Sequence, residues 1–248
     1  MLTDLLTFLA VGFAAQLVDG AIGMAYGLTS TTILLSVGVS PAMASASVHA
    51  AEVFTTGASA LSHWRLGNVD GRLFRRLALP GALGGAAGAY LLTELPGEKV
   101  QPFVSAYLCI MGGVVLWKAL RKHRGEARAP RHVPLLGFTG GFLDAIGGGG
   151  WGPMVASTLV GSGMKTRLAI GSTDAAEFLV TTTISAMFVF TIGLELWPII
   201  TGLVLGGVIA APFAAYATRA LPDRPLMILV GVVIIVLSLR GLAQAFGS

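Results

Sequence analysis

Long apolar stretches separated by short polar breaks run along the whole chain. They cover roughly 4–38, 42–63, 73–93, 101–120, 133–162, 168–192, 196–218 and 225–245. A membrane-spanning helix needs about 20 apolar residues, so six of these eight stretches suit one crossing each. The stretches 4–38 and 133–162 are too long for one crossing, and glycine-rich runs interrupt both. The pattern predicts an all-α polytopic membrane protein with about eight transmembrane segments.

The two halves of the chain repeat each other at a shift of 125 residues. The coinciding pairs include Gly12/Gly137, Asp19/Asp144, Gly23/Gly148, Gly27/Gly152, Ser47/Ser172, Glu52/Glu177 and Thr56/Thr181. A register that holds over more than 40 residues and pairs acid with acid indicates duplication. We therefore expect a first transmembrane repeat over 1–121 and a second over 133–248, joined by a basic linker over 122–132.

Charge is scarce in this sequence. Only 11% of residues are charged and 54% are hydrophobic, whereas about 25% of a soluble domain is charged. These values exclude a soluble enzyme, a nucleic-acid-binding protein and a disordered protein. The basic residues lie in or beside the polar breaks, with four at 65–76 and six at 118–131.

The loop charges predict the orientation of the chain through the positive-inside rule. Loop 64–76 is basic and loop 94–99 is acidic, whereas the equivalent loops of the second half, 193–196 and 219–224, have the opposite bias. The halves should therefore have inverted topology, which requires an odd number of crossings in each. The long first segment of each half would enter and return, or cross twice. We expect a multi-pass protein of the cell (inner) membrane with a cytoplasmic linker and both termini outside.

The interrupted segments read QLVDGAIGMAYGLTSTT (16–32) and GFLDAIGGGGWGPMVAST (141–158). Glycine and proline disfavour a regular helix, and unwound backbone at membrane depth is tolerated where it is buried or lines a cavity. Paired broken segments indicate a transporter binding site, whose half-helix N-termini suit a small anion. The alternative is close helix packing. The expected substrate contacts are Gly20, Gly23, Gly27, Thr29, Ser30, Thr31, Gly147, Gly148, Gly149, Gly150, Trp151 and Ser157.

Five acidic residues lie inside apolar stretches, where ionisable groups are costly and are functional candidates. Asp19 and Asp144 directly precede the glycine runs, so they are either helix N-caps or a proton or cation site. The other three are Glu52, Asp174 and Glu177.

The second segment of each half carries the related motifs HAAE and DAAE. The spacing of His49 to Glu52, and of Asp174 to Glu177, places each pair on one helix face. We expect these four residues and the two aspartates to line the pathway or couple transport to protons. Interhelical hydrogen bonds and metal ligation are the alternatives. Cys109 is the only cysteine, and we expect no resident metal or cofactor.

The repeated G-x6-D segment with its glycine run, the A-x2-S-x4-E continuation and the eight apolar segments resemble the sulfite exporter TauE/SafE family of permeases. The resemblance covers essentially the whole chain and is strongest in GFLDAIGGGGWGP and AIGSTDAAEF. The first half departs, because Met24, Ala25 and Tyr26 stand opposite Gly149, Gly150 and Trp151. The resemblance implies transport, usually outward, of small sulfur-containing anions such as sulfite or sulfoacetate.

The leading hypothesis is a secondary transporter that binds such an anion at the midplane and rocks one half against the other. Its partners would be a small anionic substrate and the lipid bilayer, with no nucleic acid, and a homodimer stays open. A cation or metal transporter that uses the buried carboxylates is the alternative. An enzyme is not expected, because neither His-Glu-x-x-His nor Gly-x-Ser-x-Gly is present. No basic residue is expected inside a segment, so backbone dipoles and hydroxyls would have to hold the anion.

Overall fold

A computed structural model describes residues 2–22, 25–120, 132–162, 164–193, 197–220 and 223–246, whose regular structure is entirely helical. The first half contains α1 (Leu2–Ile22), α2 (Tyr26–Ser36), α3 (Pro41–Arg65), α4 (Gly71–Glu94) and α5 (Gly97–Leu120). The second contains α6 (Val133–Gly147), the π-helical turn η1 (Gly152–Ala156), α7 (Ser157–Gly161), α8 (Thr166–Ile192), α9 (Trp197–Ala220) and α10 (Asp223–Phe246). Most of the expected linker lies outside the described residues.

The helices form a bundle suited to a bilayer. Three stretches within the described residues, 97–120, 167–192 and 227–245, are each long and apolar enough to cross a membrane. Large apolar side chains such as Phe103 and Phe190 remain exposed on the outside of the bundle, where lipid would cover them. The chain is an all-α polytopic membrane protein, as its hydrophobic pattern predicts.

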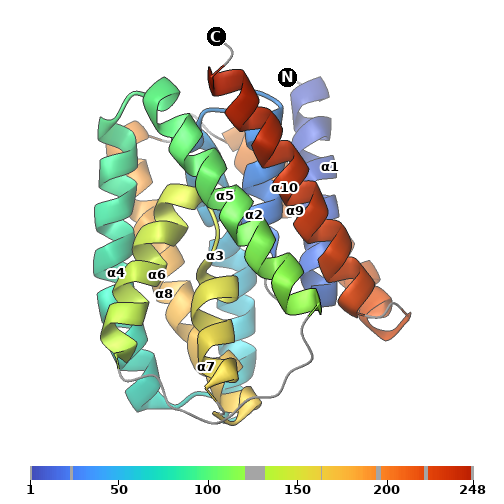
Figure 1. Ribbon diagram of the computed structural model, residues 1–248. Coiled ribbons are helices and arrows are strands. Elements are labelled where there is room, and N and C mark those ends of the chain that lie inside the picture. Colours follow the sequence, from blue (N-terminus) through green and yellow to red (C-terminus); the bar gives the residue numbers. More distant parts are fainter. Residues whose placement is uncertain are drawn as a thin grey trace.

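The first segment of each half is broken where the glycines predict it. In the first half α1 ends at Ile22 and α2 begins at Tyr26. In the second half Gly148, Gly149 and Gly150 separate α6 from η1 with φ angles of +64°, +153° and +146°. Residues other than glycine rarely adopt such backbone angles. Figure 1 shows that each broken segment runs into the bundle and turns back. The first segment starts at the end of the bundle where the chain begins, and the second finishes with α7 at the opposite end.

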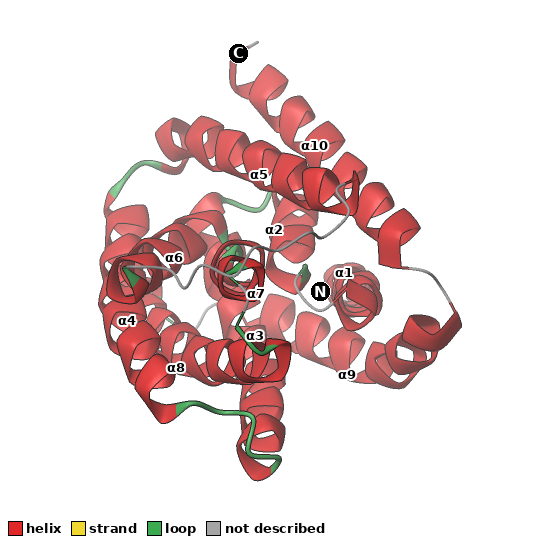
Figure 2. Cartoon of the chain, turned by 60° about the horizontal axis from the view of Figure 1, so that its bottom comes forward, coloured by secondary structure: helices red, strands yellow, loops and turns green. Residues whose placement is uncertain are grey.

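The helices of the two halves pack on each other in a reciprocal manner. The shift of 125 residues maps α1 onto α6, α3 onto α8, α4 onto α9 and α5 onto α10. Four of the most extensive contacts are α1 with α9, α4 with α6, α5 with α10 and α3 with α8, and exchange of the halves maps these four onto one another. The contact of α4 with α8 is as extensive as that of α3 with α8, but its counterpart, α9 with α3, is much smaller. In Figure 1, α5 and α10 run in opposite directions, which is the geometry of an inverted repeat. Figure 2 shows α2, α3 and α7 near the middle of the bundle.

Glycines bring α4 and α6 into close contact. A Cβ atom on Gly84 would collide with the carbonyl of Phe138, and one on Gly141 with the carbonyl of Gly81. The equivalent pair is similar, because Gly206 of α9 faces the carbonyl of Leu9 in α1. The small residues of the 81–90 segment are therefore packing positions of the kind that small-xxx-small motifs provide.

Candidate functional site

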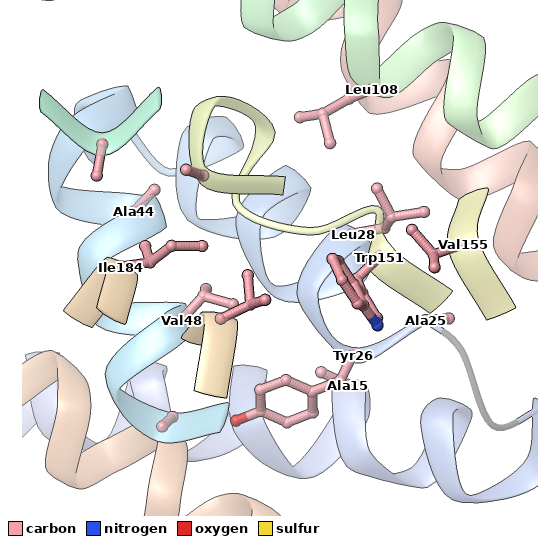
Figure 3. Close-up of a cluster of buried hydrophobic side chains, with 14 of the residues drawn as sticks. Ala15, Ala25, Tyr26, Leu28, Ala44, Val48, Leu108, Trp151, Val155 and Ile184 are labelled. Atoms are coloured by element: carbon pink, nitrogen blue, oxygen red, sulfur yellow. The ribbon is translucent and has the colours of Figure 1, made fainter. Parts of the chain in front are cut away.

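The two broken segments cross in direct backbone contact. A Cβ atom built on Gly27, in the first turn of α2, would lie 2.7 Å from Cα of Gly149 and 2.9 Å from the carbonyl oxygen of Gly148. The Thr31 hydroxyl donates a hydrogen bond of 2.6 Å to that same carbonyl. Figure 3 shows Leu28 and Trp151, one from each broken segment, among the buried side chains at this place. We call the contact of Gly27 with Gly148 and Gly149 the crossing.

Tyr107 of α5 supports the glycine run from the other side. Its hydroxyl donates to the carbonyl oxygen of Gly149 at 3.0 Å. Side chains on Gly147 or Gly150 would collide with the tyrosine ring or hydroxyl. Tyr107 is not among the site residues predicted from the sequence, where its only signal is a phenol hydroxyl within an apolar span.

Asp19 and Asp144 cap the returning half of each broken segment. Oδ1 of Asp19 accepts hydrogen bonds from the backbone N–H groups of Ala25 at 2.8 Å and Tyr26 at 3.1 Å. Oδ1 of Asp144 accepts from the N–H of Trp151 at 3.0 Å, and Trp151 is the residue equivalent to Tyr26. Both carboxylates therefore satisfy donors that helix geometry leaves unpaired. The N-cap interpretation describes both positions.

This geometry predicts different outcomes for two substitutions at Asp19. Asp19→Asn keeps an oxygen acceptor for the α2 N-terminus and should keep transport within about threefold, whereas Asp19→Ala should lower stability by about 1 kcal/mol. Thermal unfolding in detergent and transport by proteoliposomes measure the two effects. Transport that is lost equally in both variants would show that the charge of Asp19 is required, not its cap.

The second oxygen of Asp144 forms a pair with His49. Nε2 of His49 lies 3.3 Å from Oδ2 of Asp144, and both side chains are buried. Nδ1 of His49 lies 2.8 Å from the carbonyl oxygen of Ser45, and since a carbonyl only accepts, Nδ1 must donate. One further proton must then lie between Nε2 and Oδ2. The pair has no net charge, whichever partner holds that proton.

A polar seam runs between α3 and α8. On α3 the residues Ser45, His49, Glu52, Ser59 and His63 recur at helical intervals of three, four or seven. On α8 the stripe consists of Asp174, Glu177, Thr181 and Ser185. The helices are antiparallel, since the ring of His49 lies 6.5 Å from that of Phe188 and Ser59 donates to Asp174 at 2.6 Å. The seam joins the expected lining residues of both halves.

The seam reaches from partly exposed groups to the crossing. At one end Nε2 of His63 lies 3.6 Å from Oδ2 of Asp174, and both side chains are 25% exposed. Further along, Glu52 of α3 and Glu177 of α8 continue the seam. Glu52 is buried, and its Oε1 is 2.9 Å from the position that a Cβ on Gly27 would take. The seam therefore ends beside the crossing.

The other expected contact residues have varied environments. Trp151 is 1% exposed, and its indole N–H donates to the carbonyl of Thr173 at 3.2 Å. The hydroxyls of Thr29 and Ser30 are buried without hydrogen-bond partners. Gly20 lies in α1, and Gly23 lies outside the described residues.

The expectation that no basic residue lies inside a segment is wrong for Lys118. This residue belongs to α5 and is half-buried. Its ammonium group donates to the carbonyl oxygen of Pro153 and to Oγ of Ser157, both in the second broken segment. A lysine near the end of an apolar stretch looks like a topology marker in the sequence, but here its long side chain reaches inward. Ser157, an expected substrate contact, is thus next to a cation.

Two interleaved halves, crossed broken helices and a polar seam at membrane depth are the architecture of a membrane transporter. The family model described as "Sulfite exporter TauE/SafE" matches residues 8–241, and the chain belongs to this family. It is 42% identical over 248 residues to the "Probable membrane transporter protein YtnM" of Bacillus subtilis (strain 168), covering 96% of this chain and 82% of that protein. No solved structure matches.

Proposed function

We propose that the protein is a secondary transporter, in the direction of export, for a small sulfur oxyanion or organosulfonate such as sulfite or sulfoacetate. The observation that carries the proposal is the crossing, where the N-terminus of α2 meets the glycine run of the other half. Helix N-termini and glycine-rich backbone present N–H groups to small anions, and the N–H groups of Gly27 and Leu28 follow the two that Asp19 caps. Membership of the sulfite exporter family supports the same substrate class.

The two buried aspartates of the broken segments are compatible with an anionic substrate because their charges are engaged. Asp19 and Asp144 bind backbone N–H groups, and the pair of Asp144 with His49 carries no net charge. Lys118 supplies a positive charge against the second broken segment. The local field at the crossing is therefore less negative than the count of acids suggests.

The closed crossing supports an alternating-access mechanism. Gly27 and Gly149 are in contact, so an anion enters between the broken segments only when the two halves move apart on one side. Movement on the other side then releases it. The crossing acts as the central gate of this cycle.

The titratable groups of the seam are suited to carry protons. His63 and Asp174 are the partly exposed end of the seam, and Glu52 beside the crossing is its buried end. Proton exchange along these groups would couple the gate to a pH gradient. The carboxylates that suggest a cation transporter thus fit a proton-coupled anion transporter.

The charge bias of the loops supports placement of the 122–132 linker in the cytoplasm of a cell with the protein in its inner membrane. The start of α1 and the end of α10 lie at one end of the bundle (Figure 1), which this orientation assigns to the outer side. Basic residues near segment ends favour the cytoplasmic face.

Transport by purified protein in proteoliposomes tests the proposal. We expect uptake of radiolabelled sulfite or a C2 sulfonate, above that of sulfate, and a response to an imposed pH gradient. A panel of sulfite, sulfate, thiosulfate and C2 sulfonates, measured with and without the gradient, reads out the selectivity. Equal rates for all anions would contradict a sulfur-selective site, and no anion transport would overturn the function.

A further inference from the structure

A pocket with a mixed apolar and polar lining opens between α2, α5 and α10, away from the crossing. It is partly open to the surroundings, and the space enclosed within it is about 10 Å³, close to that of one water molecule. Its polar lining consists of Ser36, Gln101, Ser105, Ser238, Arg240 and Gln244. These residues lie near the end of α2, the start of α5 and the end of α10. The pocket therefore lies at the end of the bundle at which the chain starts and finishes (Figure 1).

The lining of the pocket has the chemistry of an anion site. Arg240 is the only charged residue in it, and no acid is among the lining residues of the described chain. The two glutamine amides and the serine hydroxyls add neutral hydrogen-bond donors around the guanidinium. A planar guanidinium with its fork of N–H groups binds oxyanions through paired hydrogen bonds.

Ser238 gives independent evidence for a ligand. Its side chain is 3% exposed and its hydroxyl has no hydrogen-bond partner, although it lines the pocket. A buried hydroxyl without a partner costs free energy, and such a group needs an explanation. An oxyanion held by the exposed Arg240 at the mouth of the pocket would accept this hydrogen bond directly or through one water molecule.

We propose that this pocket is a second anion site, through which the transported oxyanion passes on the termini side of the crossing. This proposal rests on the proposed anion transport, and it adds a second binding site that is separate from the crossing. Thr32 of α2 lines the pocket and lies one turn beyond Leu28 at the crossing. The site and the gate thus share α2.

Lys118 is the counterpart of the pocket on the other side. The repeat maps Gln244 onto Lys118 at a shift of 126, and Thr32 onto Ser157 at a shift of 125. Ser157 is the residue that Lys118 contacts. The repeat does not map Arg240 itself onto Lys118, but each returning half-helix has one cation beside it, from α10 in one case and from α5 in the other. The anion meets a positive charge on either side of the gate.

The concentration dependence of sulfite counterflow tests the pocket. The protein is reconstituted in phosphatidylcholine vesicles, which carry no net charge. Arg240→Gln should raise KM for sulfite about tenfold, the loss of one charge-assisted interaction, and keep the maximal rate. Arg240→Lys should recover most of the affinity. Ser238→Ala should raise KM about threefold without lowering thermal stability, because it removes a hydroxyl that the protein itself leaves unpaired.

Lys99→Gln is the matched control, since it removes an exposed positive charge at the same end of the bundle and does not line the pocket. Equal KM values for Arg240→Gln and Lys99→Gln would overturn the proposal. So would a fall in maximal rate at unchanged KM, or an effect that needs anionic lipid in the vesicles. Absence of sulfite counterflow in the unmodified protein would instead overturn the proposed function, and the pocket's role with it.

Discussion

Replacement of Gly149 by alanine is expected to abolish transport and to destabilise the protein. Gly149 has a φ angle of +153°, and forcing another residue into such a conformation costs about 1–3 kcal/mol. The added Cβ would also collide with the backbone of Gly27 and Leu28. Both effects push the two broken segments apart at the crossing. We expect transport to fall at least twentyfold, or roughly 2 kcal/mol in the barrier, measured as initial rates of sulfite uptake.

Gly161→Ala is the control for this prediction. Gly161 ends α7 in the same broken segment, and a Cβ atom there meets nothing within 4 Å. This variant should transport and unfold like the unmodified protein. Uptake by Gly149→Ala at the rate of Gly161→Ala would show that contact at the crossing is not required.

Replacement of Glu52 by glutamine is expected to remove the response of transport to a pH gradient. Glutamine has the shape of glutamic acid but cannot bind or release a proton. Glu52 is the buried end of the seam beside the crossing. Its replacement would therefore remove the proton transfer that links the seam to the crossing. We expect gradient-driven uptake to fall at least about tenfold, since buried acids in membranes act as proton relays. Sulfite exchange without a gradient should persist.

The matched control is Glu98→Gln, which removes an exposed carboxylate at the start of α5 and should leave the gradient response unchanged. Glu177→Gln should weaken the response in the same way as Glu52→Gln, because both belong to the seam. Normal, pH-dependent transport by both glutamine variants would show that protons do not pass along α3 and α8.

Much of the architecture could be predicted from the sequence because its signals are local. The breaks in the first segments follow from the backbone demands of glycine, and the observed φ angles at Gly148, Gly149 and Gly150 explain why no other residue stands there. The role of Asp19 and Asp144 as caps was one of two open alternatives. Their position just before a restarted helix is visible in the sequence, whereas the direction of their oxygens is not.

The contacts between distant segments could not be predicted in the same way. Nothing near Tyr107 or Lys118 in the sequence refers to the second broken segment, which each contacts from α5. The sequence places Lys118 among the loop charges, because the residues that follow it are basic. Its contact with Ser157 depends on the packing of α5 in the folded bundle, and sequence periodicity carries no information on that packing.

The packing of helices from one half against helices from the other has a consequence for biosynthesis. The most extensive neighbour of α1 is α9, the penultimate helix of the chain. When α1 leaves the ribosome and enters the bilayer, the helix that will cover it has not yet been made. Since α1 and α9 are joined through Gly12, Gly202 and Gly206, lipid must occupy these close-packing surfaces until synthesis is nearly complete. The bundle can therefore be completed only after the last quarter of the chain has been inserted. A chain truncated before α9 would leave α1 without its main packing partner.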